Sequence, residues 1–149
     1  MNRYDEIVMK KVLIIAPNFQ PESVGGATRI YQMVKEIQNE YDVTVICPPP
    51  TYPFTKYEKS NRIFQKQILD GITIYRIWTY QPSTINPSSV GRFLYYTIFP
   101  ILTNLFLFRL LRDVSFVIIS TPPPSLLITS WIVRLCQKKL IIDVRDLWI

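Results

Sequence analysis

The chain has 149 residues, enough for one domain with a hydrophobic core, and 48% of them are hydrophobic, which argues against a disordered chain. It contains no histidine, so a Ser-His-Asp triad, a histidine base and a histidine zinc site are excluded. Its two cysteines, Cys47 and Cys136, stand in apolar surroundings without metal-ligand spacing, which predicts reduced core residues in a cytoplasmic protein.

The net charge of +6 is unevenly distributed along the chain. Residues 1–70 carry nine basic and eight acidic side chains, whereas residues 71–142 carry seven basic side chains and one acidic residue, Asp113. The basic residues form no run and accompany no nucleic-acid motif, so we expect no nucleic-acid partner. Because the basic part of the chain is also the most apolar, it favours contact with anionic lipid head groups.

Strand and helix patterns alternate in the first half of the chain. Residues 1–9 are polar at first and lack a secretory signal, so we treat them as an extension of a domain over 10–149. An apolar run at 12–16 predicts a buried strand, and residues 42–47 predict the next one. Between them, a helix is predicted by apolar residues on one face: Ile30, Met33, Val34, Ile37 and Tyr41.

The alternation continues to the end of the chain. Residues 48–69 are predicted to be a long connection, followed by a strand over 71–78, a helix over 88–112 and a strand over 115–120. A helix over 122–137, with Thr121 as its N-cap, is apolar nearly all round and is expected to be buried. A strand over 139–144 follows. This order predicts a Rossmann-like α/β domain: a parallel sheet with helices on both faces and ligands at the carboxyl ends of the strands.

Two glycines, Gly25 and Gly26, open the first helix directly after the first strand and its loop. Glycines at a helix start let a phosphate approach unpaired backbone amides; alternatively they serve a tight turn or close packing. The segment "ESVGGAT" has neither the dinucleotide spacing G-x-G-x-x-G nor the Gly-Lys-Ser/Thr of a P-loop. No acidic residue closes the second strand, which disfavours a dinucleotide-binding dehydrogenase.

In chain order, "KVLIIAPNFQPESVGGATRIYQMVKEI", "YDVTVICPPPTYP", "DGITIYRIWTY", "DVSFVIISTPPPSLL" and "KKLIIDVRDLW" resemble the N-terminal half of family 4 glycosyltransferases. The resemblance is strongest to the bacterial and archaeal branch that builds surface polysaccharide and lipid-linked sugars. It covers residues 10–149, and its most specific parts are the Pro-x-Phe-x-Pro…Gly-Gly loop and the terminal Asp-x-Arg-Asp-Leu-Trp.

The resemblance implies the N-terminal, acceptor-binding domain of a GT-B fold. It implies transfer of a sugar from a nucleotide-sugar co-substrate to a lipid-linked or polysaccharide acceptor, with retention and without a metal or other cofactor. Gly25 and Gly26 would then bind the donor diphosphate. We expect acceptor contacts from residues around the loop and from the last strand: Asn18, Glu22, Thr28, Arg29 and Arg145. The donor-binding domain is missing from these 149 residues, so the chain is expected to be inactive alone.

The end of the last predicted strand carries three further candidates. A carboxylate at Asp143, between Ile142 and Val144, needs a partner, which we expect to be backbone or Arg145. Asp146 is predicted as the catalytic residue that orients or deprotonates an acceptor hydroxyl. Arg145 could instead pair with phosphate on a lipid-linked acceptor.

Residues 93–108 are free of charge for sixteen positions and are bracketed by Arg92 and Arg109. Three interpretations of this segment remain open: a buried crossover helix, a helix in the membrane interface, and a helix that spans the membrane. A spanning helix needs about twenty apolar residues. For the interfacial alternative, the predicted membrane contacts are Arg92, Phe93, Tyr95, Tyr96 and Arg109. The protein would then be peripheral on the inner face of the cell membrane. A rival function is a non-catalytic membrane-surface module that partners a separate donor-binding chain.

Overall fold

A six-stranded sheet in the order β3-β4-β2-β1-β5-β6 forms the centre of the computed structural model, which describes residues 9–145. All neighbouring strands are parallel except β3 and β4, which are antiparallel. The elements in chain order are β1 (Lys10–Ile15), α1 (Gly25–Ile37), β2 (Tyr41–Cys47), β3 (Phe64–Leu69), β4 (Ile72–Ile77), α2 (Ser89–Leu110), β5 (Val114–Thr121), the 3₁₀-helix η1 (Pro124–Leu127), α3 (Ile128–Leu135) and β6 (Lys139–Val144).

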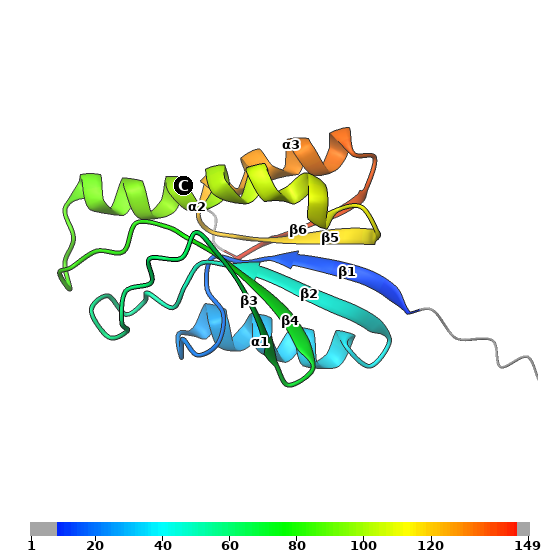
Figure 1. Cartoon of the computed structure of the whole chain (residues 1–149), viewed down its shortest axis with the longest axis horizontal. Coiled ribbons are helices and arrows are strands. Elements are labelled where there is room, and N and C mark those ends of the chain that lie inside the picture. The colour runs from blue at the N-terminus through cyan, green and yellow to red at the C-terminus, as the bar shows by residue number, and fades with distance from the viewer. Residues whose placement is uncertain (1–8, 146–149) are drawn as a thin grey trace, which may run out of the picture.

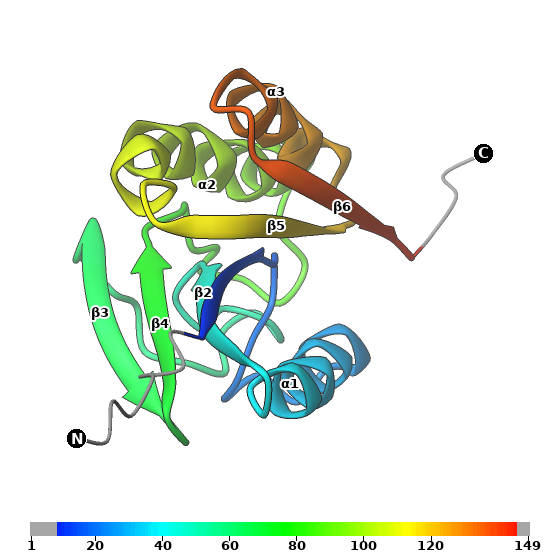
Figure 2. The same cartoon turned by 90° about the vertical axis from the view of Figure 1, so that its right-hand side faces the viewer.

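Helices cover both faces of the sheet: α1 lies on one face, and α2 and α3 lie together on the other (Figures 1 and 2). Strand β1 lies at the centre, and its residues alternate between the two faces, so Val12 and Ile14 pack towards α1 while Leu13 and Ile15 pack towards α2. All four are at most 1% exposed. The predicted α/β class and the buried first strand are confirmed.

One strand of the sheet was not predicted. Residues 48–69 were expected to be a connection throughout, but Phe64–Leu69 form β3, which pairs with β4 at the edge of the sheet. A two-residue turn of Asp70 and Gly71, both at positive φ (49° and 80°), joins the two strands. The prediction failed because β3 is an exposed edge strand with polar residues at its centre, so it lacks the apolar run of a buried strand.

Two helix predictions also need correction. Helix α1 ends at Ile37, and Tyr41 begins β2 instead of continuing the helical stripe. The stretch predicted as one helix over 122–137 is the short η1 followed by α3, and Thr121 is the last residue of β5 and not a helix cap. The prediction that this stretch is buried was also wrong, because α3 packs on the sheet with one side only.

Candidate functional site

The carboxyl ends of β1, β5 and β6 meet the beginning of α2 around a cavity of about 530 Å³. Its volume is in the range of small-molecule sites. The cavity is lined by Pro17 and Asn18 after β1, by Arg92, Phe93, Tyr96 and Thr97 of α2, by the segment 122–125 after β5, and by Arg145 after β6. The structure thus brings together five predicted site residues: Asn18, Arg92, Phe93, Tyr96 and Arg145.

The charged side chains that line this cavity are basic. Two guanidinium groups, from Arg92 and Arg145, line it together with aromatic rings and proline, and within residues 9–145 no carboxylate is among the lining residues. Guanidinium groups bind phosphate and carboxylate through paired hydrogen bonds, and apolar walls strengthen such contacts by excluding water. The cavity therefore suits an anionic group attached to a sugar or to an apolar chain.

Gly26 makes room for Arg145. A Cβ atom on Gly26 would overlap the Arg145 guanidinium group and lie 3.0 Å from its Cζ atom, whereas a Cβ on Gly25 would meet nothing within 4 Å. Arg145 is held from the other side by a hydrogen bond from its Nε to the carbonyl oxygen of Thr121, at 3.1 Å. The close neighbour of Gly26 is therefore the positively charged Arg145 side chain, which also lines the cavity.

The start of α1 lies beside this guanidinium group. The first amides of an α-helix have no intrahelical partner, and α1 has no side-chain cap hydrogen bond among the described residues. Its N-cap residue is Val24, in extended conformation, so Gly25 and Gly26 are the first two residues of the helix. Free amides and the positive end of the helix dipole thus meet the Arg145 side chain, an arrangement that attracts anions.

Asp143 joins three elements beside the cavity. Arg29 of α1 donates from Nη1 to both carboxylate oxygens of Asp143 at 3.2 Å, and the two residues form an ion pair. Ser120 of β5 donates to Asp143 Oδ2 at 2.9 Å. The prediction that the Asp143 carboxylate pairs with backbone or with Arg145 was therefore wrong: its partners are the side chains of Arg29 and Ser120. Arg29 thereby links α1 to β6, and its predicted contact with the acceptor stays a prediction.

Glu22 holds two loops together. Its side chain is 1% exposed, and its carboxylate accepts hydrogen bonds from the amides of Thr51 and Tyr52, both at 2.7 Å, and from Asn18 Nδ2 at 2.9 Å. Burial raises the pKa of Glu22, and the hydrogen bonds it accepts oppose this shift without cancelling it. The expectation that Glu22 touches the acceptor is corrected: it positions Asn18 and the loop after β2.

Arg76 is a buried arginine that the sequence prediction missed, because it was counted only within the basic excess. It is 3% exposed and donates to the carbonyl oxygen of Pro48, to Cys47 Sγ and to Gln67 Oε1, each at 3.1 Å, and also to the carbonyl oxygen of Gln20. It therefore ties β4 to the loops after β1 and β2. Burial raises the pKa of the Cys47 thiol to about 11, so this cysteine stays protonated and unreactive.

Some of the other predicted site residues are exposed and others are buried. Arg92, Phe93, Tyr96 and Arg109 are exposed on α2, but Tyr95 is only 5% exposed, so its predicted membrane contact is wrong. Its ring packs against Phe54 at 5.4 Å between centroids, because position 95 lies on the inner side of α2. Thr28 is half-buried on α1. Asp146, the predicted catalytic residue, lies outside the described residues.

Searches with protein-family models and among curated proteins find no match to this chain. Within residues 9–145, no group of three or more Asp, Glu, Cys or His side chains is placed to hold a metal ion.

Proposed function

We propose that this chain contains the acceptor-binding domain of a retaining glycosyltransferase, which moves a sugar from a nucleotide-sugar to a lipid-linked or polysaccharide acceptor. The contact between Gly26 and Arg145 carries the proposal. It brings the two most specific parts of the family-like pattern, the Gly-Gly loop and the Asp-x-Arg segment, together at one edge of a cavity lined by Arg145. These segments are more than one hundred residues apart in the chain, and either alone would fit many α/β domains.

The chemistry of this edge fits the proposed reaction. A sugar leaves a nucleotide diphosphate as negative charge builds on the diphosphate, and preorganised donors stabilise that charge. The amides at the start of α1 would supply such donors, and the Arg145 guanidinium group beside them would bind phosphate on a lipid-linked acceptor. The aromatic residues Phe93 and Tyr96 offer apolar surface for a sugar ring or a lipid chain. The nucleotide-binding lobe that a GT-B enzyme requires is not among residues 9–145.

Ligand binding by the chain itself tests the acceptor site. We expect a short-chain alkyl diphosphate sugar to bind and to shift the NMR signals of residues that line the cavity. Replacing Arg145 by Gln should weaken binding by about tenfold or more, because a charge-assisted hydrogen bond contributes about 1.5–3 kcal/mol. Replacing the exposed Arg92 by Gln should weaken it less, since water competes for that side chain.

Arg134→Gln is the matched control, because Arg134 is an exposed arginine of α3 that does not line the cavity. It should bind the ligand like the wild type. If the control lost as much ligand binding as Arg145→Gln, the loss would be due to the change in net charge and not to a contact made by Arg145. Binding of NAD with shifts at Gly25 and Gly26 would favour a dehydrogenase and contradict the proposal.

A further inference from the structure

Helix α2 exposes an apolar stripe along its whole length. The stripe points away from the sheet, because Phe99 and Leu107 on the opposite side of the helix are buried in the core. Its five members are 53–70% exposed and follow the spacing i, i+3, i+11, i+15, i+18: Val90, Phe93, Ile101, Leu105 and Phe108.

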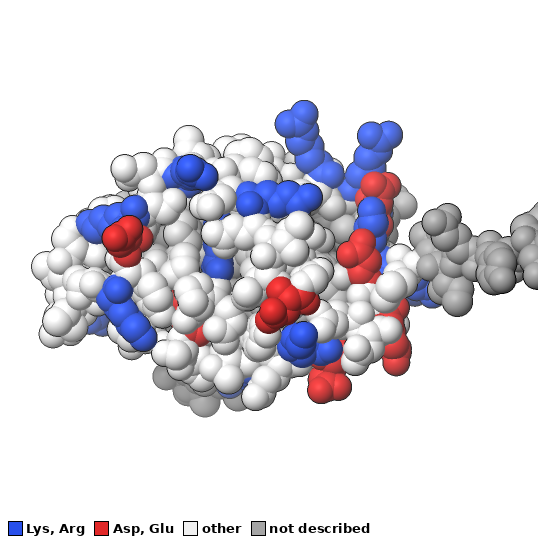
Figure 3. Space-filling model, turned by 60° about the horizontal axis from the view of Figure 1, so that its bottom comes forward, with Lys and Arg blue, Asp and Glu red and all other residues white. Residues whose placement is uncertain are grey.

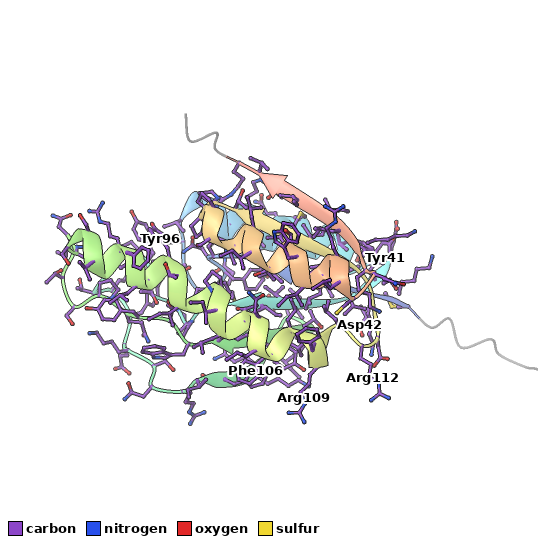
Figure 4. All side chains as sticks on the ribbon, turned by 90° about the horizontal axis from the view of Figure 1, so that it is seen from above. Tyr41, Asp42, Tyr96, Phe106, Arg109 and Arg112 are labelled. Atoms are coloured by element: carbon purple, nitrogen blue, oxygen red, sulfur yellow. The ribbon has the colours of Figure 1, made fainter. Side chains whose placement is uncertain are left out.

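A second stripe lies on the neighbouring helix. Ile128, Trp131 and Leu135 of α3 are 58%, 73% and 75% exposed and follow the spacing i, i+3, i+7. Helices α2 and α3 contact each other and cover the same face of the sheet, so their outer sides form one surface (Figure 4). We call these eight side chains the α2–α3 face. They include an exposed tryptophan, a residue that is common where proteins meet the membrane interface.

The charged side chains on the helices of the α2–α3 face are all basic, and acidic side chains near them are few: Asp113 after α2 and Asp42 of β2, which lies near Arg109. Helices α2, η1 and α3 contain no Asp or Glu, and Asp113 is the single acidic residue between 89 and 139. Arg109 projects from the last turn of α2 and Arg112 from the turn that follows it (Figure 4), and Arg92 is exposed near the beginning of α2. Helix α3 carries one further basic residue, Arg134, and two more come directly after the helix, Lys138 and Lys139. In contrast, Figure 3 views the molecule from the α1 side, where both signs of charge are interspersed.

This charge pattern selects among occupants of the face. A second copy of the chain packed through the same face would bring like charges together, which opposes association. An anionic bilayer supplies both an apolar layer for the stripes and negative head groups for the basic rim. Length and composition alone would allow α2 to cross a membrane. However, spanning would require α2 to leave the sheet and would expose core residues such as Leu107.

We propose that the α2–α3 face docks on the surface of an anionic membrane, with α2 and α3 lying in the plane of the interface. Phe93 belongs both to this face and to the cavity, so docking would place the cavity mouth beside the lipid surface. The proposal rests on exposure and charge and holds whether or not the domain takes part in sugar transfer.

Flotation of the chain with lipid vesicles tests the proposal. We expect the folded protein to float with vesicles of phosphatidylcholine and phosphatidylglycerol, to bind pure phosphatidylcholine much more weakly, and to detach partly at high salt. The double variant Leu105→Ser/Trp131→Ser should lower the partition coefficient at least about tenfold. The control is Ile63→Ser, which removes an exposed apolar side chain (59%) outside the face and should leave partitioning unchanged.

A charge series tests the basic rim separately. Arg109→Gln and Arg134→Gln should each lower binding to anionic vesicles by about fivefold and reduce its salt dependence. Lys35→Gln, in the last turn of α1 on the opposite face, should have no effect. All variants change exposed or half-exposed side chains, and circular dichroism with urea unfolding confirms that each is folded before flotation.

Four outcomes would overturn the proposal. The first is failure of the folded wild type to float with anionic vesicles, and the second is a loss of binding by Ile63→Ser equal to that of the double variant. Resistance to carbonate extraction would show that α2 spans the bilayer. Sedimentation of a dimer that Trp131→Ser converts to a monomer would assign the face to a second copy of the chain.

Discussion

Two buried charged residues organise the loops at the carboxyl end of the sheet. Glu22 joins the loop after β1 to the loop after β2, and Arg76 reaches from β4 to the same two loops. Each is at most 3% exposed, so each side chain depends on its hydrogen-bond partners to offset the loss of hydration. The positions of Asn18 and of the cavity wall therefore rest on residues that do not line the cavity.

Glu22 makes stability depend on pH. Burial raises its pKa in the folded protein above the ordinary value of 4.5, so between pH 4.5 and the raised pKa the folded state holds a proton that the unfolded state has lost. The contribution of Glu22 to the free energy of unfolding is therefore full below pH 4.5 and falls as pH rises, by at most about 1.4 kcal/mol per pH unit. Replacing Glu22 by Gln should remove this fall, as measured by urea unfolding at several pH values.

The Ala variant separates charge from hydrogen bonding at the same position. Glu22→Ala leaves the amides of Thr51 and Tyr52 without their acceptor and should lower the free energy of unfolding by about 1–3 kcal/mol per amide at every pH. A wild type and a Gln variant with parallel pH profiles would show that Glu22 titrates normally and would contradict the assignment.

At the scale of elements, the β3–β4 hairpin depends on its turn. Asp70 and Gly71 both adopt positive φ, as the two central residues of a type I′ hairpin turn require. This turn sets the register in which Leu69 faces Ile72 and Phe64 faces Ile77. The register places Phe64 against Phe106, with 5.0 Å between the ring centroids, so the edge strand also packs on α2.

Replacing Gly71 by Ala should destabilise the protein by about 1–2 kcal/mol, because an L-residue is disfavoured at φ +80°. Space is not the cause, since a Cβ on Gly71 would meet nothing within 4 Å. Gly25→Ala is the control: its Cβ is equally unhindered, and Gly25 lies in α1, so this variant should be neutral or slightly stabilising. Urea unfolding measures both, and equal effects would contradict a role for positive φ.

At the scale of the whole molecule, the sheet is buried at its centre and exposed at both edges. Strand β1 pairs with β2 on one side and β5 on the other, whereas β3 and β6 each have one paired neighbour within residues 9–145. The apolar residues Ile141, Ile142 and Val144 of β6 are 42–57% exposed. Cooperative stability is therefore concentrated in β1 and the two strands beside it.

Hydrogen exchange should report this gradient. We expect the amides of Val12–Ile15 in β1 and of Val117–Ile119 in β5 to exchange only through global unfolding, because their side chains are at most 5% exposed and each of these strands is paired on both sides. Amides of β3 and β6 should exchange earlier, through local opening. Protection of β3 equal to that of β1, measured by NMR at low denaturant, would contradict this order.

The sequence alone determined the class of the fold and the edge of the sheet that carries the cavity. Continuous apolar runs such as Val12–Ala16 mark strands buried on both faces, and their alternation with helical patterns requires a parallel sheet. Tertiary structure decided the rest. The partners Arg29 and Asp143 are 114 residues apart, and the contact of Gly26 with Arg145 depends on which strands become neighbours. Likewise, a helix pattern cannot state which side meets the sheet, so the exposure of Trp131 and the burial of Tyr95 emerged only when α3 and α2 were packed. Local spacing encodes the shape of each element, whereas burial and charge pairing are properties of the assembled chain.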